Sequence, residues 1–318
     1  MKNFGITGVA GYIAPRHLQA IKDTESRLIA AMDPHDSVGI IDRYFQDTSF
    51  FTEFERFDRH LEKLRRSNEG RSIDYLSICS PNNLHDAHIR LALRLGAHAI
   101  CEKPLVLNPW NLDALQELEN ESYGNVYTIL QLRVHPSLIE MKNKLQKEKN
   151  RKHEVTLTYI TSRGPWYKYS WKCDHQKSGG VATNIGIHFF DLLMRYFGKV
   201  ENSELYLSTE DKMSGFVELE NANVKWFLSI DRNDLPMEVV KNNKSTFRSI
   251  KVDDEELEFT EGFTDLHTKV YSETLAGRGF GIETARPSVE LVYKIRNEKI
   301  SMKRKDVHPF AAKILGIK

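Results

Sequence analysis

The sequence predicts an α/β protein of two domains: a doubly wound parallel sheet first, then an α+β domain built on a large, mainly antiparallel open sheet. Three observations support this prediction. Apolar strand runs alternate with amphipathic helices early in the chain, loops of small and polar residues follow those strands, and strands succeed one another directly in the later part. A chain of 318 residues suits two domains, which we place at residues 1–125 and 126–318.

The first strand, Phe4–Thr7, runs straight into a turn of small residues. The turn covers Gly8–Ala14, and a helix follows over Pro15–Asp23 with Leu18 and Ile21 at helical spacing. A dinucleotide pyrophosphate binds in such a setting, because small residues admit the phosphates and the helix N-terminus offers N–H groups. The spacing departs from the strict G-x-G-x-x-G pattern, so an ordinary strand–helix turn is the alternative interpretation.

The second strand, Leu28–Met32, ends in an acid. Asp33 stands 22 residues after Gly11, close to the roughly 20 residues expected for a carboxylate that binds a dinucleotide ribose. A carboxylate there accepts hydrogen bonds from both ribose hydroxyls and repels a 2′-phosphate, so the sequence favours NAD over NADP. A solvated loop acid is the alternative for Asp33, and the nearby His35 keeps the exclusion of NADP from being complete.

Strands and helices continue to alternate up to residue 132. In chain order we expect a helix at Ser37–Phe45, a strand at Phe50–Thr52, a helix at Glu53–Arg66, a strand at Ile73–Cys79, a helix at Leu84–Leu95, a strand at His98–Cys101, a helix from Pro109 to Ser122 and a strand at Val126–Leu132. This repetition is typical of a doubly wound parallel sheet.

Two later loops carry polar groups suited to chemistry. Ser80–His85 and Glu102–Pro104 each follow an apolar strand. The carboxyl ends of parallel strands share one edge, so these loops should lie with the glycine turn and with Asp33–Ser37. A lysine that is partly desolvated at this edge can lose its proton near neutral pH and act as a base, which makes Lys103 the candidate base. A surface turn without function is the alternative for this segment.

The later part of the chain is rich in strands. We expect a connecting helix at Ser137–Glu148, strands at His153–Thr161, Glu204–Thr209, Met213–Leu219, Val224–Ile230, Ser245–Val252 and Leu257–Thr260, and helices at Phe189–Phe197, His267–Arg278 and Ser288–Asn297. Such a succession predicts the mainly antiparallel sheet.

Two segments of this later part are candidates for ligand binding. The loop Ser162–Lys172 is crowded with aromatic and cationic residues, which can stack flat rings and hold anions. A surface arm packed on a neighbouring subunit is its alternative role. The segment Gly179–His188 leads into a helix and places His188 at the helix start. A histidine at a helix start is more often structural, so the role of His188 depends on the residues around it.

Composition excludes several classes of protein. The chain has 45 basic and 44 acidic residues and a net charge of +1, which gives no reason to expect nucleic acid or an anionic membrane as a partner. No run is long and apolar enough to span a bilayer, and the N-terminus does not resemble a signal peptide. The cysteines Cys79, Cys101 and Cys173 lack metal-ligand spacing. We therefore expect a soluble cytoplasmic protein without a bound metal.

Three motifs in this order resemble the glucose–fructose oxidoreductase, inositol dehydrogenase and rhizopine-catabolism family (Gfo/Idh/MocA). They are G-x-x-G-x-I-A-x-x-H from Gly8, S-P-N-x-x-H from Ser80 and E-K-P from Glu102. The resemblance implies an N-terminal Rossmann domain, a lysine beside the nicotinamide and the substrate carbinol, and a Lys–Pro bond that is often cis. The family carries an acid four residues before the histidine, where this chain has Asn184. That departure leaves Lys103 and His188 as the acid–base pair.

Several strings are similar to one subgroup of that family, the UDP-N-acetyl-D-glucosaminuronate 3-dehydrogenases of bacterial O-antigen and lipopolysaccharide synthesis. They are G-x-A-G-Y-I-A-P-R-H, Q-L-R from Gln131, Y-I-T-S-R-G-x-W-Y from Tyr159, S-W-K from Ser170 and G-V-A-T-N-I-G-x-H from Gly180. The similarity implies NAD-dependent oxidation of the C3 hydroxyl of this UDP-sugar to a ketone. It also implies a homotetramer and, in several members, reoxidation of the cofactor by 2-oxoglutarate.

Residues and resemblance together assign three sets of site residues. The catalytic set is Lys103 and His188. The cofactor-binding set is Gly8, Gly11, Tyr12, Ile13, Asp33, Ser37, Ser80, Asn82, His85, Glu102, Lys103, Gln131 and Trp166. The substrate-binding set is Lys103, Gln131, Arg133, Arg163, Tyr167, Lys172, Asn184 and His188, with Lys168 as a further anion contact. Two other functions stay open: another sugar or cyclitol dehydrogenase of the family, and a non-catalytic NAD-binding regulator.

Overall fold

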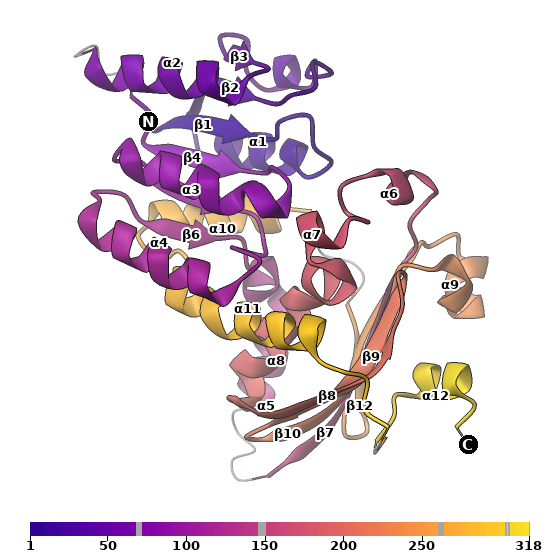
Figure 1. Cartoon of the computed structure of the whole chain (residues 1–318). Helices are drawn as coiled ribbons and strands as arrows, with labels where there is room; N and C mark the ends of the chain where they lie inside the picture. The colour runs from indigo at the N-terminus through magenta and orange to yellow at the C-terminus, as the bar shows by residue number, and fades with distance from the viewer. Residues whose placement is uncertain (68–71, 146–150, 260–263, 303, 305, 318) are drawn as a thin grey trace. The chain divides into compact units, whose positions relative to one another are not determined.

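The computed structural model describes residues 1–67, 72–145, 151–259, 264–302, 304 and 306–317. The chain divides into two compact units, each with one six-stranded sheet (Figure 1). The first unit comprises Met1–Val134 and Thr264–Arg286, and the second comprises His135–Phe263 and Pro287–Lys318. The segment from Thr264 to Arg286 therefore joins the first unit after a long excursion of the chain.

The sheet of the first unit is parallel throughout, in the order β3-β2-β1-β4-β5-β6. Its strands are β1 (Asn3–Thr7), β2 (Arg27–Met32), β3 (Ser49–Phe51), β4 (Tyr75–Ile78), β5 (His98–Cys101) and β6 (Val126–Thr128). The strand order reverses between β1 and β4, and ligands of such sheets bind outside the carboxyl ends of the strands at this point. The prediction of a doubly wound parallel sheet is confirmed.

Helices cover both faces of this sheet (Figure 1). One face carries α2 (Phe54–Arg66), α3 (His85–Arg94) and α4 (Pro109–Glu121), and the other carries α1 (Ala14–Asp23) and α10 (Leu266–Leu275). The core beneath α1 and α10 includes Phe4, whose ring stacks on Tyr75 at 5.1 Å and on Tyr271 at 5.8 Å between centroids. Tyr271 of α10 is fully buried, so the late segment completes the core of the first unit.

Two elements of the first unit differ from the sequence prediction. The helix expected at Ser37–Phe45 is reduced to the 3-10 turn Ile41–Arg43. Val38, Ile40, Tyr44 and Phe45 still pack on the core, so their apolar character reflects burial of an irregular segment. The strand expected at Val126–Leu132 ends at Thr128, because the chain turns into the 3-10 segment Gln131–Val134.

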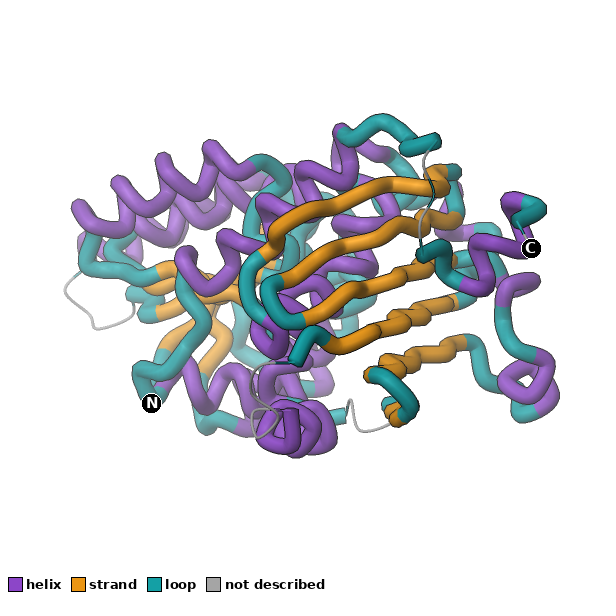
Figure 2. Tube along the Cα trace, turned by 90° about the horizontal axis from the view of Figure 1, so that it is seen from below, coloured by secondary structure: helices purple, strands orange, loops and turns teal. Residues whose placement is uncertain are grey.

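The second sheet is mixed but mainly antiparallel, as predicted, in the order β12-β11-β7-β10-β9-β8, with β7 and β10 as its parallel pair (Figure 2). Its strands are β7 (His153–Thr161), β8 (Val200–Ser208), β9 (Lys212–Leu219), β10 (Ala222–Ser229), β11 (Thr246–Val252) and β12 (Glu255–Glu258). The expected strand at Leu257–Thr260 lies partly outside the described residues, as does the end of the expected helix Ser137–Glu148.

Alternation along the strands sends side chains to two separate layers. Tyr159 and Trp226 contact Phe189 and Phe190 of α8 (Ile187–Phe197). Their neighbours in sequence, Ile160 and Phe227, lie in a second cluster with residues of α9 and α12. The remaining helices are α5 (Pro136–Leu145), α6 (Trp166–Tyr169), α7 (His175–Ser178), α9 (Met237–Lys241), α11 (Ile282–Asn297) and α12 (Pro309–Leu315).

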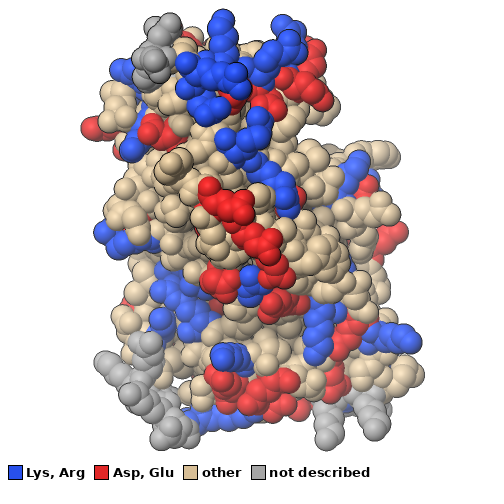
Figure 3. All heavy atoms as spheres, turned by 60° about the vertical axis from the view of Figure 1, so that its left-hand side comes forward, with Lys and Arg blue, Asp and Glu red and all other residues tan. Residues whose placement is uncertain are grey.

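The charged surface agrees with the balanced composition. Basic and acidic side chains are interspersed on the face drawn in Figure 3, and the net charge is +1. Within the described ranges, no helix is long and apolar enough to cross a membrane.

Candidate active site

The glycine turn after β1 is shaped by a close approach of two backbones. Gly8 has φ +77°, and a Cβ added there would lie 2.5 Å from the carbonyl carbon of Cys79. The N–H of Gly8 donates to the carbonyl of Met32 at 2.8 Å. A Cβ on Gly11 would lie 3.0 Å from the Gly8 carbonyl oxygen. The turn therefore needs glycine at Gly8 and leaves little room for a side chain at Gly11, and it delivers the chain directly into α1, whose N-terminus suits a pyrophosphate.

Asp33 is buried at the end of β2 and is fixed by two backbone N–H groups. Its Oδ2 accepts from Ala10 at 2.9 Å, and its Oδ1 accepts from His35 at 2.9 Å. The carboxylate is thus held beside the glycine turn, at the position expected of a ribose ligand. His35 and Ser37 are exposed on the segment that follows.

His85 joins the two later loops of the same sheet edge. Its Nδ1 lies 2.7 Å from the carbonyl oxygen of Pro104, and its Nε2 lies 3.0 Å from that of Ser80. Burial lowers the pKa of His85, and the two carbonyl contacts oppose this effect. The ring is fully buried, and its contacts hold the two loops together. Ser80 is engaged separately, because its hydroxyl pairs with Nδ1 of His88 at 2.8 Å.

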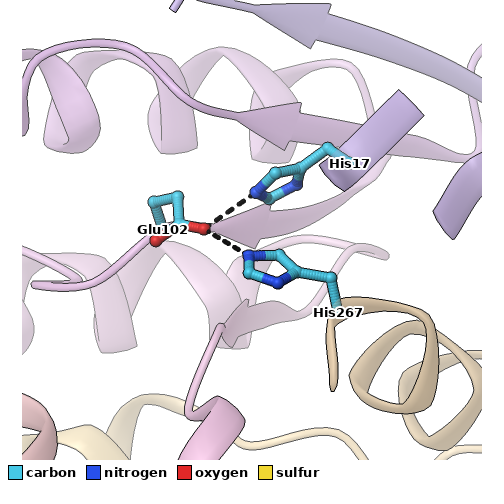
Figure 4. A group of neighbouring side chains, drawn as sticks. All are labelled: His17, Glu102 and His267. Carbon is cyan, nitrogen blue, oxygen red and sulfur yellow. Dashed lines mark hydrogen bonds and ion pairs between the residues drawn. The ribbon is translucent and has the colours of Figure 1, made fainter. Parts of the chain in front are cut away.

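Glu102 directly follows β5 and lies between two histidines (Figure 4). Its Oε1 lies 2.9 Å from Nε2 of His17 and 2.9 Å from Nε2 of His267. Burial alone would raise the pKa of Glu102, but the two histidine hydrogen bonds outweigh it and hold the pKa well below its ordinary range. An ionised carboxylate therefore stands directly before Lys103. The Lys103–Pro104 peptide bond is cis, as the family resemblance implied.

Asn184 and Tyr167 form the polar centre of the second unit. Asn184 lies in the π-helical turn Ala182–Gly186 just before α8, and such turns are frequent at functional sites. Its Nδ2 donates to the Tyr167 hydroxyl at 2.8 Å, and both side chains are buried. Burial raises the pKa of Tyr167, which keeps its hydroxyl protonated.

The aromatic and cationic loop Ser162–Lys172 contributes further groups in the second unit. Nζ of Lys172 lies 5.6 Å from the ring centroid of Trp166 and 5.7 Å from that of Trp171. Arg163 holds the loop to β10, because its N–H donates to the carbonyl of Ile230, and its Nε is buried without a hydrogen-bond partner among the described residues. The loop thus places the Lys172 ammonium beside two aromatic rings and provides a second cation in Arg163, both of which can bind anions.

Family models match both units in turn. Residues 2–129 match the NAD-binding Rossmann fold of the oxidoreductase family GFO_IDH_MocA, and residues 151–240 match the C-terminal alpha/beta domain of that family. The chain belongs to this oxidoreductase family. The family's N-terminal domain is an NAD-binding Rossmann fold, which confirms the predicted cofactor and the prediction of an NAD-dependent oxidoreductase.

Solved structures give the strongest similarity. The WlbA (WbpB) dehydrogenase of Thermus thermophilus, crystallised with NAD and UDP-GlcNAcA, is 51% identical, with 98% of this chain and 100% of that chain covered and a TM-score of 0.94. The same protein with NAD and alpha-ketoglutarate has 52% identity, the same coverage and a TM-score of 0.94. A WlbA dehydrogenase from Chromobacterium violaceum shares the fold at 18% identity and a TM-score of 0.74, covering 92% of each chain.

Curated relatives are more distant. The inositol 2-dehydrogenase of Rhizobium meliloti is 25% identical over 62% of this chain and 55% of its own length. The glucose-6-phosphate 3-dehydrogenase of Bacillus subtilis is 25% identical over 94% of this chain and 76% of its own length. The chain thus spans about half the length of the inositol dehydrogenase that it matches.

The predicted site residues fall into two groups within this family fold. The first unit brings together Gly8, Asp33, His85 and Glu102 at the sheet edge where the family binds its cofactor. Gln131 lies in the same unit with a buried Oε1 that has no hydrogen-bond partner in the described ranges, as expected of a ligand-binding amide. The orphaned oxygen and the glycine cradle fit a bound dinucleotide.

The structure locates the remaining site residues, and their roles stay predictions. Tyr12 and Trp166 are exposed, Ile13 is half-buried, and Asn82 is buried in the first turn after β4. The guanidinium of Arg133 lies 5.5 Å from the ring centroid of Phe280. Lys103 belongs to the first unit and His188 to the second, so their pairing in proton transfer stays a prediction.

The fold also assembles a donor set that the sequence did not suggest. Nε2 of His17, Oε1 of Glu102 and Nε2 of His267 are potential metal ligands within 4.8 Å of one another. Both histidines already direct Nε2 at the carboxylate at hydrogen-bond distance, so a proton on each Nε2 accounts for these two contacts, whereas Nδ1 of His267 is buried with no hydrogen-bond partner among the described residues. We therefore describe the set as a hydrogen-bonded cluster. His267 carried no signal in the sequence, because 165 residues separate it from Glu102.

Proposed function

We propose that this protein is an NAD-dependent dehydrogenase of a sugar nucleotide, and that it oxidises the C3 hydroxyl of UDP-N-acetyl-D-glucosaminuronate (UDP-GlcNAcA) to a ketone. The observation that carries this proposal is 51% identity over 98% of the chain to a dehydrogenase crystallised with NAD and UDP-GlcNAcA. At this identity, the polar groups described above support a shared substrate class. The distant curated relatives support only the broader class of sugar and cyclitol dehydrogenases.

The first unit supplies the cofactor site and the base. The glycine turn leaves room for the pyrophosphate, and Asp33 offers carboxylate oxygens to the adenosine ribose. NAD, when bound, accepts the hydride that leaves C3 of the sugar. Lys103 accepts the proton of the C3 hydroxyl as the hydride leaves C3. The secondary alcohol at C3 thereby becomes a ketone. His188 assists this proton transfer.

The second unit supplies the groups that hold the substrate. UDP-GlcNAcA carries a uronate carboxylate and a diphosphate, so its site needs several cations. Arg163 offers a planar fork suited to a carboxylate, whereas Lys168 and Lys172 offer point charges suited to phosphates. Asn184 and Tyr167 are already joined at 2.8 Å and position each other for contact with the sugar. A neutral polyol carries no anionic group for these cations to bind, which favours the sugar nucleotide over inositol.

The reduced cofactor needs an acceptor if the enzyme retains it between turnovers. We propose 2-oxoglutarate, because a 52% identical dehydrogenase was crystallised with NAD and alpha-ketoglutarate. In this half-reaction NADH gives a hydride to the keto carbon, a proton completes the new hydroxyl, and the products are 2-hydroxyglutarate and NAD⁺. We further propose that the protein is a homo-oligomer, a tetramer by family resemblance, and that it acts in O-antigen synthesis.

The proposal is tested by following NADH absorbance after mixing the protein with UDP-GlcNAcA and NAD⁺. The expected result is substrate-dependent reduction of NAD⁺, with 2-hydroxyglutarate appearing once 2-oxoglutarate is added. Parallel reactions with free inositol and free glucose serve as controls. Turnover of these polyols without turnover of UDP-GlcNAcA would favour another dehydrogenase of the family. NAD binding without any turnover would favour a regulator.

A further inference from the structure

A buried chain of hydrogen bonds leads into the carboxylate that precedes Lys103. The exposed fractions of His17, His267 and Tyr271 are 0%, 3% and 0%, so their contacts lie in the interior of the protein. His17 of α1 and His267 of α10 converge on Glu102, directly after β5 (Figure 4), and Tyr271 of α10 contacts His17. Burying several polar groups is unfavourable unless hydrogen bonds compensate for the lost contacts with water.

The hydrogen-bonding capacity of each group indicates where protons lie along this chain of hydrogen bonds. A carboxylate oxygen only accepts, so His17 and His267 each carry a proton on Nε2. Nδ1 of His17 lies 2.7 Å from the Tyr271 hydroxyl. The Tyr271 oxygen in turn pairs with the Ser77 hydroxyl at 2.6 Å. The hydrogen bonds therefore form one continuous chain, in the order Ser77, Tyr271, His17 and Glu102.

The pKa shifts of Tyr271 and His267 indicate the protonation state of these two groups. Burial raises the pKa of Tyr271 and lowers the pKa of His267, although hydrogen bonding to Glu102 opposes the second effect. Tyr271 thus stays a neutral phenol and His267 a neutral imidazole. The titratable groups that interact with Glu102 from the surrounding elements are His17, Cys79, His85, Cys101, His267 and Tyr271. Arg16 interacts with His267, and Lys103 interacts with His85.

We propose that His17 and His267 are positioning residues that clamp Glu102 as an anion, and that this clamp fixes the strand end from which Lys103 projects and stabilises the lysine's ammonium form. The inference depends on the proposed role of Lys103 as the base. It assigns no contact with substrate to the two histidines. Because the carboxylate adjoins the lysine in the chain, loosening either histidine changes both where Lys103 stands and how readily it gives up a proton.

Three variants test the clamp by kinetics. His267→Leu removes the donor, His267→Gln keeps an N–H at similar reach, and Glu102→Gln keeps the shape but not the charge. We expect His267→Leu to lower kcat by about 10-fold to 100-fold, with the Kd for NAD and the KM for UDP-GlcNAcA nearly unchanged, and His267→Gln to recover most of the loss. His308→Leu, which removes a buried histidine of the second unit, is the matched control and should keep its kcat.

A second readout does not depend on turnover. The rate at which an amine-specific acylating reagent modifies Lys103, followed by peptide mass spectrometry across pH, reports the titration of this lysine. Loss of the neighbouring negative charge destabilises the ammonium, so Glu102→Gln should move the titration of Lys103 to lower pH. This labelling reports on the clamp even if the protein proves inactive on UDP-GlcNAcA, so failure of the clamp and failure of the proposed function are distinguishable.

Three outcomes would overturn the inference. An unchanged Lys103 titration in Glu102→Gln would show that the carboxylate does not act on the lysine. A folded His267→Leu variant with normal kcat would show that the clamp is dispensable. Stoichiometric metal in the purified protein, lost in His267→Leu, would show that the three side chains hold an ion instead of sharing protons.

Discussion

The Asp33 carboxylate accepts the backbone N–H of Ala10 at 2.9 Å and so ties the end of β2 to the glycine turn. Asp33→Ala removes this anchor and the acceptors proposed for the ribose. We expect it to weaken NAD binding by at least about 10-fold, one charge-assisted hydrogen bond being worth about 1.5–3 kcal/mol, and to reduce the preference for NAD over NADP. Isothermal titration with both cofactors measures the change. The exposed neighbour Asp36 provides the control Asp36→Ala, and equal losses in both variants would place the ribose contact elsewhere.

Gly8 and Gly39 form a matched pair for testing the turn. A Cβ on Gly8 would lie 2.5 Å from Cys79 and on a backbone with φ +77°, whereas a Cβ on Gly39 meets nothing within 4 Å. Gly8→Ala should therefore lower the melting temperature by about 4–8 °C, from about 2 kcal/mol of strain, and should impair NAD binding. Gly39→Ala should leave both unchanged. Thermal melts of the two variants, with equal stability as the contrary result, decide the point.

Lys103→Ala and His188→Asn test the assignment of the proton-transfer residues. Each should keep NAD affinity and lose at least about 100-fold in turnover, the low end of a general acid–base contribution. Lys63→Ala, on the exposed side of α2, controls for loss of a lysine charge. Steady-state rates with UDP-GlcNAcA provide the measurement. A near-normal rate in Lys103→Ala would assign the base to another residue.

The Asn184–Tyr167 hydrogen bond predicts a loss in substrate affinity on removal of one hydroxyl. Tyr167→Phe leaves the buried Asn184 amide without this acceptor, and we expect the KM for UDP-GlcNAcA to rise by about 5-fold to 30-fold, the equivalent of about 1–2 kcal/mol. NAD binding should not change. Tyr169, which is 91% exposed, provides the control Tyr169→Phe. An equal KM in both variants would remove Tyr167 from the substrate site.

Two buried histidines predict loss of stability in acid. Burial lowers the pKa of His88 to about 3, with His85 adding to the effect, and burial with a contribution from Lys225 lowers the pKa of His308 to about 3. The unfolded chain therefore binds more protons than the folded chain between about pH 3 and pH 6.5. The stabilisation is complete above the unfolded pKa and is lost as the pH falls through this window.

Melting temperatures recorded from about pH 8 down to about pH 4 test the acid prediction. His308 accepts the Phe310 N–H on Nδ1 and pairs with the Thr158 hydroxyl through Nε2. His308→Gln removes the titrating group and should make the decline shallower than in the parent protein. An unchanged slope would mean that His308 is protonated in the folded state.

Local patterns in the sequence were sufficient for the parallel sheet and its loops. Strand runs such as His98–Cys101 and the turn at Gly8 are read within a few residues, and they fix which loops share an edge. The cluster around Glu102 could not be read in this way, because His267 arrives 165 residues later through packing of α10 on α1. Apolar content also misled at Ser37–Phe45, where burial of irregular chain resembled a helix.

The proposed reaction predicts one product with one new functional group. The most direct test is to incubate the protein with NAD⁺, 2-oxoglutarate and UDP-GlcNAcA, and to analyse the sugar nucleotide by mass spectrometry and nuclear magnetic resonance. The account predicts a product lighter than the substrate by two hydrogens, with a ketone carbon at C3 and no signal for H3. A sugar nucleotide recovered unchanged, or a ketone at another carbon, would contradict it.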